Sequence, residues 1–219
     1  MRIELQSVSK GKGIALPATS CTFESGVVTR AVCETEQRPT VLGLIASGRM
    51  RPDTGRVLLD GDDRARREIR RRSALVDTPG ISEPEPNVSL GGAIAEELLY
   101  IGIPGTPVQV RRWAEQLGVA EHLALPVADL TPAVRVRVLA ELAALRDGIE
   151  AIVLVSPDRH GGQPAEWWAI AERLAARGFA VLVIAGSAAD AALAKADARA
   201  NDQALSNGAE PSDGQEESE

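Results

Sequence analysis

Two nearly all-apolar runs near the end of the chain constrain its fold most strongly. The runs are AIVLV, residues 151–155, and FAVLVIAG, residues 179–186. Such runs are typical of central parallel strands that are covered on both faces of a sheet. The segment between them, PAEWWAIAERLAARG, has the pattern of a helix. Because parallel neighbouring strands need a crossover connection, this pattern predicts a layered α/β domain.

Shorter patterns upstream predict more elements of this domain. Alternating Ile3, Leu5 and Val8 indicate an opening strand, and TSCTFES and VVTRAVC indicate two more. The segment PTVLGLIASG predicts a helix that begins near Pro39, because proline is tolerated in a first turn. The run SALVD, residues 73–77, predicts a buried strand that ends at the turn signal TPG.

The middle of the chain has helical patterns only. SLGGAIAEELLYIG and PVQVRRWAEQLG predict two amphipathic helices, which form a small helical subdomain at about residues 89–126. The next helix is expected to open with Thr131 as its cap and Pro132 in its first turn. We expect one domain over residues 1–202 and a disordered, acidic tail over residues 203–219.

Composition argues against several classes of protein. A net charge of −7 and an aromatic content of 3% argue against nucleic-acid binding. Cys21 and Cys33 are the only cysteines, and no His/Cys cluster has metal-site spacing, so we expect no metal. No run approaches the length of about 20 apolar residues that spans a bilayer, and the start lacks the apolar part of a signal peptide. We therefore expect a cytoplasmic protein.

The order and spacing of these elements resemble the ATP-binding subunit of ABC transporters over roughly residues 1–190. The segment LGLIASGRMRPDTGRVLLDG matches best, because it resembles the helix after the family's phosphate loop and the turn and strand that follow. LTPAVRVRV falls on the family's signature helix, with its pattern kept at Leu130, Arg135, Arg137 and Val138. The resemblance implies an α/β fold: an ABC-type P-loop ATPase core with a mainly parallel sheet, N-terminal antiparallel strands and a small helical subdomain.

The family's phosphate loop falls on CETEQRPTV, where its chemistry is missing. Glycines let backbone N–H groups approach the phosphates, and a lysine contacts the β- and γ-phosphates. The glycine and lysine positions here hold Cys33, Glu36, Arg38 and Pro39. Glu34 and Glu36 add negative charge where a triphosphate would lie. Thr40 keeps a hydroxyl for magnesium and Arg38 keeps a positive charge, so Arg38 and Thr40 are the candidate cofactor-binding residues, with at most weak binding of ATP and magnesium.

The family's other functional positions are altered as well. The Walker B aspartate and the glutamate after it fall on Ser156 and Pro157, so Asp158 is the candidate for a displaced acid. The signature serine falls on Thr131, and its two glycines fall on Pro132 and Ala133. The loop glutamine falls near Asp77 or Thr78, and the histidine falls near Gly186. Because positioning and charge carry phosphoryl transfer, we expect no useful ATP hydrolysis and assign no catalytic residue.

The resemblance also implies a partner. In the family, a groove beside the loop after the SALVD-type strand receives a helix of the membrane permease, and residues 78–100 map there. The candidate partner-binding residues are Thr78, Pro79, Gly80, Glu83 and Asn87. We therefore interpret the chain as a pseudo-ATPase that docks on a permease at the inner face of the cell membrane. It would act as a homodimer or in a heterodimer with another ABC ATPase subunit.

Two alternatives stay open. The first is a soluble regulatory or scaffolding module that reuses the fold and senses another anion through Arg38 or through DRHGG, residues 158–162. In that segment Asp158 and His160 are a candidate acid–base pair, and Arg159 is a candidate anion ligand. The second is an unusual but active ATPase.

Three other features have simpler interpretations. VDTPG resembles a GTPase motif, but the phosphate loop that such a site requires is absent, so a turn is the better interpretation. The arginine run 64–72 indicates a solvated basic face. Of Trp167 and Trp168, which are adjacent on one helix, one is expected in the core and the other at the surface.

Overall fold

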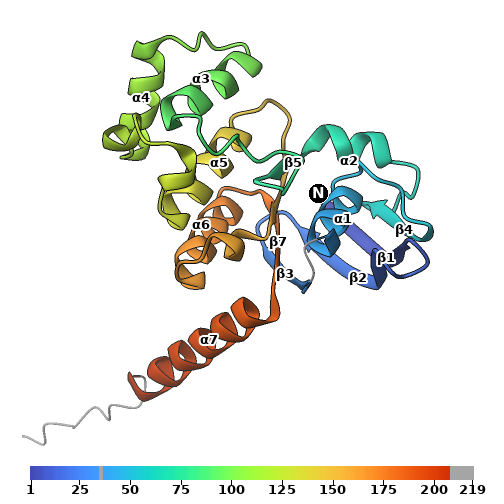
Figure 1. The fold of residues 1–219 in the computed structure, drawn as a ribbon. Helices are drawn as coiled ribbons and strands as arrows, with labels where there is room; N and C mark the ends of the chain where they lie inside the picture. The colour runs from blue at the N-terminus through green and yellow to red at the C-terminus, as the bar shows by residue number, and fades with distance from the viewer. Residues whose placement is uncertain (35–36, 208–219) are drawn as a thin grey trace, which may run out of the picture.

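The computed structural model describes residues 1–34 and 37–207, and a four-stranded parallel sheet lies at its centre (Figure 1). In spatial order the strands are β3 (Val28–Val32), β7 (Ala180–Ala185), β6 (Ala151–Val155) and β5 (Ser73–Val76). The register places Val181 opposite Val28 on one side and Ile152 on the other. Every residue of β5, β6 and β7 is buried, so the prediction of central strands from the apolar runs is confirmed.

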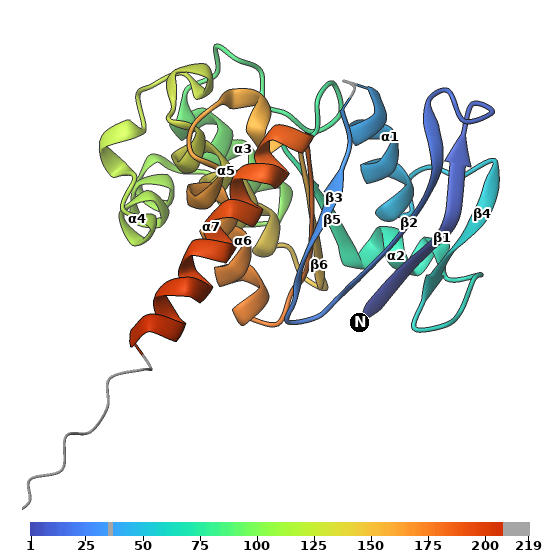
Figure 2. The ribbon, with the colours of Figure 1, turned by 90° about the horizontal axis from the view of Figure 1, so that it is seen from below.

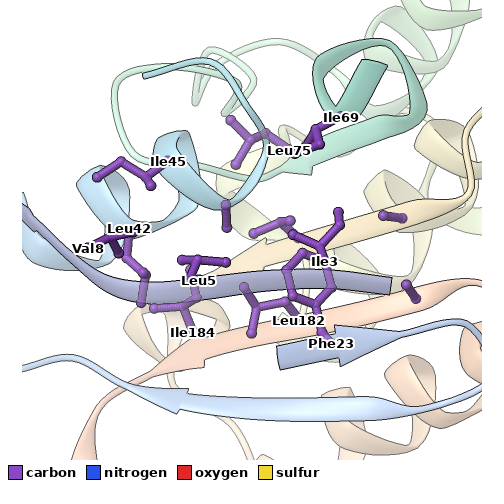
Figure 3. Close-up of a cluster of buried hydrophobic side chains, with 14 of the residues drawn as sticks. Ile3, Leu5, Val8, Phe23, Leu42, Ile45, Ile69, Leu75, Leu182 and Ile184 are labelled. Atoms are coloured by element: carbon purple, nitrogen blue, oxygen red, sulfur yellow. The ribbon is translucent and has the colours of Figure 1, made fainter. Parts of the chain in front are cut away.

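A second, antiparallel sheet packs on one side of this centre. Its order is β2-β1-β4, and its strands are β1 (Arg2–Lys10), β2 (Leu16–Glu24) and β4 (Thr54–Leu59). Figure 2 shows helix α1 (Gln37–Ala46) between the two sheets. A hydrophobic core fills this space, and Ile3, Phe23 and Leu42 are fully buried in it (Figure 3). A Cβ on Gly43 would lie 2.8 Å from Cγ2 of Val155, so this glycine lets α1 pack closely on β6.

Helices cover the opposite face of the parallel sheet (Figure 2). They are α5 (Pro132–Ala144), α6 (Pro164–Ala176) and α7 (Ser187–Asn207). Trp167 is 1% exposed in the core beneath them, whereas Trp168 is half-buried and lies 5.3 Å from the guanidinium of Arg30. One tryptophan is therefore in the core and the other at the surface, as predicted. Thr131 is the N-cap of α5, as predicted, and its backbone is extended, although its side chain makes no capping hydrogen bond.

The helical subdomain has a core of its own. It contains α3 (Leu90–Tyr100), α4 (Pro107–Leu117) and the 3₁₀ turns η1 (Ala120–His122) and η2 (Val127–Asp129). Leu90, Ile94 and Leu98 of α3 pack against Val138 and Leu142 of α5. Because α5 also contributes to the core under the parallel sheet, it joins the subdomain to the rest of the fold. Figure 1 shows α3 and α4 at the end of the molecule away from β1, β2 and β4.

Helices α2 (Arg66–Arg72) and α7 correspond to two segments that the sequence singled out, the arginine run and the end of the domain. The short helix α2 leads directly into β5 and carries the arginine run. Helix α7 continues to Asn207, so the boundary expected at Gln203 falls inside a helix, and residues 208–219 lie outside the described part of the chain. Within the described ranges, no helix combines the length and apolar character that a bilayer crossing requires.

Candidate functional site

The carboxyl ends of the four parallel strands meet at one cavity, which we call the strand-end cavity. Its volume is about 220 Å³. It is lined by Cys33, Glu34, Pro39, Pro79, Ser156, Asp158, Arg159 and Gly186. These residues follow β3, β5, β6 and β7, so the fold brings the segment after β3 and the segment after β6 together. Arg38 and Thr40 flank Pro39 in the first turn of α1 and are both half-buried.

Glu34 is engaged at the start of α7. Its Oε1 accepts a hydrogen bond of 2.9 Å from the backbone N–H of Ser187. Hydrogen bonds from the side chain and the backbone of Ser187 hold the pKa of Glu34 below its ordinary value. A helix N-terminus favours a negative charge, so the carboxylate suits this position. Glu36, the second carboxylate of the loop, lies outside the described residues.

Asp158 is engaged at the same junction. Its Oδ2 accepts a hydrogen bond of 2.9 Å from the backbone N–H of Gly186. Its Oδ1 is buried and has no hydrogen-bond partner in the described part of the chain. The carboxylate thus lies at the end of β7. Asp158 and Glu34 together bind two successive N–H groups, those of Gly186 and Ser187.

Asp77 is the centre of a buried charge cluster next to the strand-end cavity. Only 4% of its surface is exposed, and its φ of 50° turns the chain sharply after β5. Its carboxylate accepts hydrogen bonds of 2.9 and 2.7 Å from Nε and Nη2 of Arg135. It also accepts one of 3.0 Å from Nη2 of Arg159, and Nε2 of His160 lies 3.0 Å from its Oδ2.

The pKa of Asp77 follows from these contacts. Burial alone would raise the pKa, because it disfavours a charge. Hydrogen bonds from Arg135 and His160 and the charges of Arg159 and Arg135 outweigh burial and hold the pKa of Asp77 well below its ordinary range. Asp77 is therefore ionised at neutral pH and neutralises Arg135, which is 5% exposed.

Arg159 and His160 do not take the roles that the sequence suggested. Nη1 of Arg159 donates to the carbonyl oxygens of Asp77 and Val155, at 2.5 and 3.1 Å, and its Nη2 also contacts Glu83 Oε2 at 3.0 Å. The guanidinium is thus engaged within the chain rather than offered to an anion. His160 pairs with Asp77 and not with Asp158, so the expected acid–base pair is not formed.

The predicted partner-binding residues divide between the interior and the surface. Thr78 is 0% exposed and does not reach the surface, so its assignment to a partner contact was wrong. Pro79 is half-buried at the strand-end cavity, and Gly80 and Asn87 are exposed. Oε1 of Glu83 accepts a 2.8 Å hydrogen bond from the N–H of Gly80, which together with its contact to Arg159 fixes this loop.

Beside this loop lies a larger hollow, which we call the subdomain groove. One cavity of about 350 Å³ is bordered by residues 81–84, by α3 and by the end of α5. A neighbouring cavity of about 380 Å³ shares Tyr100 and Arg146 with it. Large apolar side chains are exposed at or next to these cavities: Ile81 (53%), Leu99 (64%), Tyr100 (76%), Ile103 (39%) and Leu145 (38%).

Charged groups border the same groove. Nη2 of Arg146 pairs with Oε2 of Glu97 at 2.6 Å, and the guanidinium lies 4.9 Å from the centre of the Tyr100 ring. The range 78–100 that the resemblance mapped to a partner groove includes Ile81 and Tyr100, although neither was singled out, and Arg146 lies outside it. The signal for Tyr100 was the apolar run LLY, residues 98–100, at the end of α3, since it is apolar around more than one face of the helix.

Comparisons with known proteins agree with this fold. No family model matches the sequence, and neither does any curated protein sequence. A putative ABC transporter ATP-binding protein from Pyrococcus furiosus matches with a TM-score of 0.60 and 15% identity, over 85% of this chain and 92% of that one. The cbiO1 protein from Clostridium perfringens, part of the ABC transporter complex cbiONQ, matches with a TM-score of 0.56 and 14% identity, over 84% and 77%.

A dimeric bacterial ABC transporter cassette also matches, with a TM-score of 0.58 and 18% identity, over 84% of this chain and 87% of that one. The chain therefore has an ABC ATPase-like α/β fold, with an antiparallel N-terminal sheet, a parallel sheet of four strands and several helices. The predicted fold class is confirmed, and the structure resembles those of ABC transporter ATP-binding subunits.

Proposed function

We propose that the chain is a docking subunit with an ABC ATPase-like fold, which binds a membrane permease and does not hydrolyse ATP efficiently. One observation carries this proposal. Glu34 and Asp158 accept hydrogen bonds from Ser187 and Gly186, so carboxylates of the chain take two N–H groups at the edge of the strand-end cavity. Free N–H groups at such a strand or helix end are what binds a phosphate in nucleotide sites.

The lining of the strand-end cavity supports weak or absent nucleotide binding. A volume of about 220 Å³ is below the range of roughly 300–1,000 Å³ that small-molecule sites occupy. Pro39 has no N–H to offer, and Glu34 and Asp158 bring negative charge. Two like charges about 4 Å apart repel by roughly 4 kcal/mol at an effective dielectric constant of about 20. A magnesium triphosphate does not fit these residues.

The subdomain groove supports the docking part of the proposal. Ile81 and Tyr100 are 53% and 76% exposed at its edge, which suits the apolar face of a short amphipathic helix. The loop that forms its wall is held by the contacts of Glu83 with Gly80 and Arg159, none of which involves a nucleotide. The neighbour cbiO1 is described as part of a transporter complex, which is consistent with a permease as the partner.

Assembly with a second ATPase-like chain belongs to the same proposal. One structural neighbour is described as dimeric, so this chain is proposed to act as a homodimer or in a heterodimer with an active subunit. Both arrangements place the protein at the inner face of the membrane through the permease.

A binding experiment tests the docking part. The tagged chain is expected to co-purify from detergent-solubilised membranes with a protein that has several apolar spans of about 20 residues. The variant Ile81→Asp/Tyr100→Asp should lose this protein. The matched control Val108→Asp changes an apolar residue that is 69% exposed on α4, and it should retain it. Recovery of the same membrane protein by the groove variant would contradict docking at this groove.

A second measurement tests the ATPase part. Purified chain with magnesium and ATP is expected to show no turnover above a protein-free control. Nucleotide affinity tighter than a Kd of about 0.1 mM, together with turnover, would show that the chain is an unusual but active ATPase.

A further inference from the structure

A second cavity of the described chain is lined by arginine and lies toward the other end of α1 from the strand-end cavity. Its volume is about 420 Å³. The lining residues are Ile45, Met50, Arg51, Pro52, Gly55, Arg56, Val57, Asp63, Arg64 and Arg66. Pro39 at the start of α1 borders the strand-end cavity, whereas Ile45 near the end of α1 borders this one. Ile45 lies six positions after Pro39, which corresponds to about 9 Å along the axis of α1. We call this second site the arginine cavity.

Its charge is opposite to that of the chain. Four guanidinium groups line the arginine cavity, against the single carboxylate of Asp63, although the chain carries a net charge of −7. Arg56 and Asp63 are 4.0 Å apart, at the limit of an ion pair. Nη1 of Arg66 donates to the carbonyl oxygen of Gly48 at 3.2 Å. Within residues 1–34 and 37–207, the side chains of Arg51 and Arg64 have no hydrogen-bond or ion-pair partner, so both are available to a ligand.

The floor of the cavity is apolar and rigid. Ile45 is 0% exposed, and Met50 and Val57 pack against the hydrophobic core between the two sheets. Gly55, with a φ of 79°, brings β4 so close to β1 that a Cβ there would lie 2.4 Å from the carbonyl oxygen of Gln6. The backbone next to Arg56 is therefore held by close packing, and the exposed side chains of Arg51, Arg56 and Arg64 can reach a ligand above this floor.

We propose that the arginine cavity binds an organic phosphate, with the phosphate on the guanidinium groups and the apolar part of the ligand on the floor. A guanidinium group matches a phosphate because it offers two parallel N–H donors. A site with several arginines is therefore expected to prefer a doubly charged phosphate ligand over a ligand with one carboxylate. A volume of about 420 Å³ lies within the range of small-molecule sites, roughly 300–1,000 Å³. The site is separate from the strand-end cavity, so this proposal does not depend on permease docking or on ATP hydrolysis.

Calorimetry on the full chain, in low salt and without magnesium, tests the site with phenyl phosphate and inorganic phosphate as probes. Phenyl phosphate is expected to bind with a Kd below about 1 mM and several-fold more tightly than inorganic phosphate, because only phenyl phosphate contacts the apolar floor. The variant Arg51→Glu/Arg64→Glu should weaken binding of phenyl phosphate by at least about tenfold. The matched control Arg111→Glu/Arg112→Glu makes the same change of charge on exposed positions of α4 and should bind as the parent chain does.

A second arm distinguishes a free phosphate compound from a lipid headgroup. Vesicles of phosphatidylcholine with and without phosphatidylglycerol are sedimented with each variant. Binding to the phosphatidylglycerol vesicles that is lost in Arg51→Glu/Arg64→Glu, but kept in the control, would assign the phosphate to a lipid headgroup. If only the binding of phenyl phosphate is lost in Arg51→Glu/Arg64→Glu and kept in the control, and no variant binds the vesicles, the ligand would be a free phosphate compound.

Three outcomes would overturn the proposal: neither probe binds, the cavity variant and the α4 control behave alike, or Arg38→Glu abolishes binding while the cavity variant does not. The last outcome would move the site to the start of α1. Circular dichroism of each variant confirms that lost binding does not reflect lost folding.

Discussion

The strand-end cavity and the subdomain groove differ in how their side chains are satisfied. Around the cavity, charged groups are paired within the chain: Arg159 with Asp77 and Glu83, and Glu34 with the N–H of Ser187. Asp77 and Glu83 themselves also border the groove, so the comparison concerns its exposed apolar edge. At the groove, Ile81 and Tyr100 are largely exposed. Paired polar groups stabilise a fold, whereas exposed apolar groups contribute little to it and mark binding surfaces. Substitutions should therefore cost stability at the first region and binding at the second.

The largest effect is expected from Asp77→Ala. It leaves Arg135 buried without its counter-ion, which typically costs roughly 3–5 kcal/mol in the free energy of unfolding. Urea denaturation measures this loss, with Asp129→Ala on the exposed part of η2 as the control. A loss no larger than that of the control would mean that the cluster is not a stabilising unit.

The next effect is a dependence of stability on pH. The pKa of Asp77 is lower in the folded chain than in the unfolded chain, where it is about 3.9. Its contribution is therefore fully present above that pH and is lost as the pH falls below it, by at most about 1.4 kcal/mol for one pH unit. Between pH 4 and pH 3, the stability of the parent chain should fall more steeply than that of Asp77→Asn. Parallel curves would contradict this assignment.

A smaller effect is expected from Asp158→Ala, which removes the acceptor for the N–H of Gly186. One hydrogen bond contributes about 1 kcal/mol, so thermal unfolding should shift slightly, and more than in the exposed control Asp147→Ala. ATP turnover should stay at the background level in both variants. A measurable turnover of the parent chain that disappears in Asp158→Ala would instead identify Asp158 as a displaced catalytic acid.

The smallest effect on stability is expected at the groove. Ile81→Asp/Tyr100→Asp changes exposed side chains, so the free energy of unfolding should stay within about 0.5 kcal/mol of the parent value. If the same variant also fails to co-purify with a membrane protein, the two results together would show that the groove residues act in binding and not in folding. A large loss of stability would show that Ile81 or Tyr100 belongs to the core.

Much of the fold could be predicted because its signals are local. The run AIVLV is β6 in full, and Pro132 begins α5, since burial on both faces and the first turn of a helix each leave a pattern within a few residues. The charge cluster could not be predicted in this way. Asp77 contacts Arg135, Arg159 and His160, which lie 58, 82 and 83 positions away along the chain.

The same limit explains the errors at the candidate site. His160 is two residues from Asp158, but the 3₁₀ turn η3 (Pro157–His160) directs its ring to Asp77. Thr78 was assigned to a partner contact because the resemblance maps it to a docking loop, yet it is fully buried just after β5. The subdomain groove forms where three separate segments meet, so its shape follows from tertiary packing that no short motif encodes.

The pairing of Asp77 with Arg135 has a mechanical consequence. Asp77 follows a strand of the parallel sheet, whereas Arg135 belongs to α5, which carries one face of the helical subdomain. Any rotation of that subdomain about the sheet would have to draw opposite charges apart away from water. A displacement of α3 would therefore be transmitted through α5 and the Arg135–Asp77 ion pair to the parallel sheet.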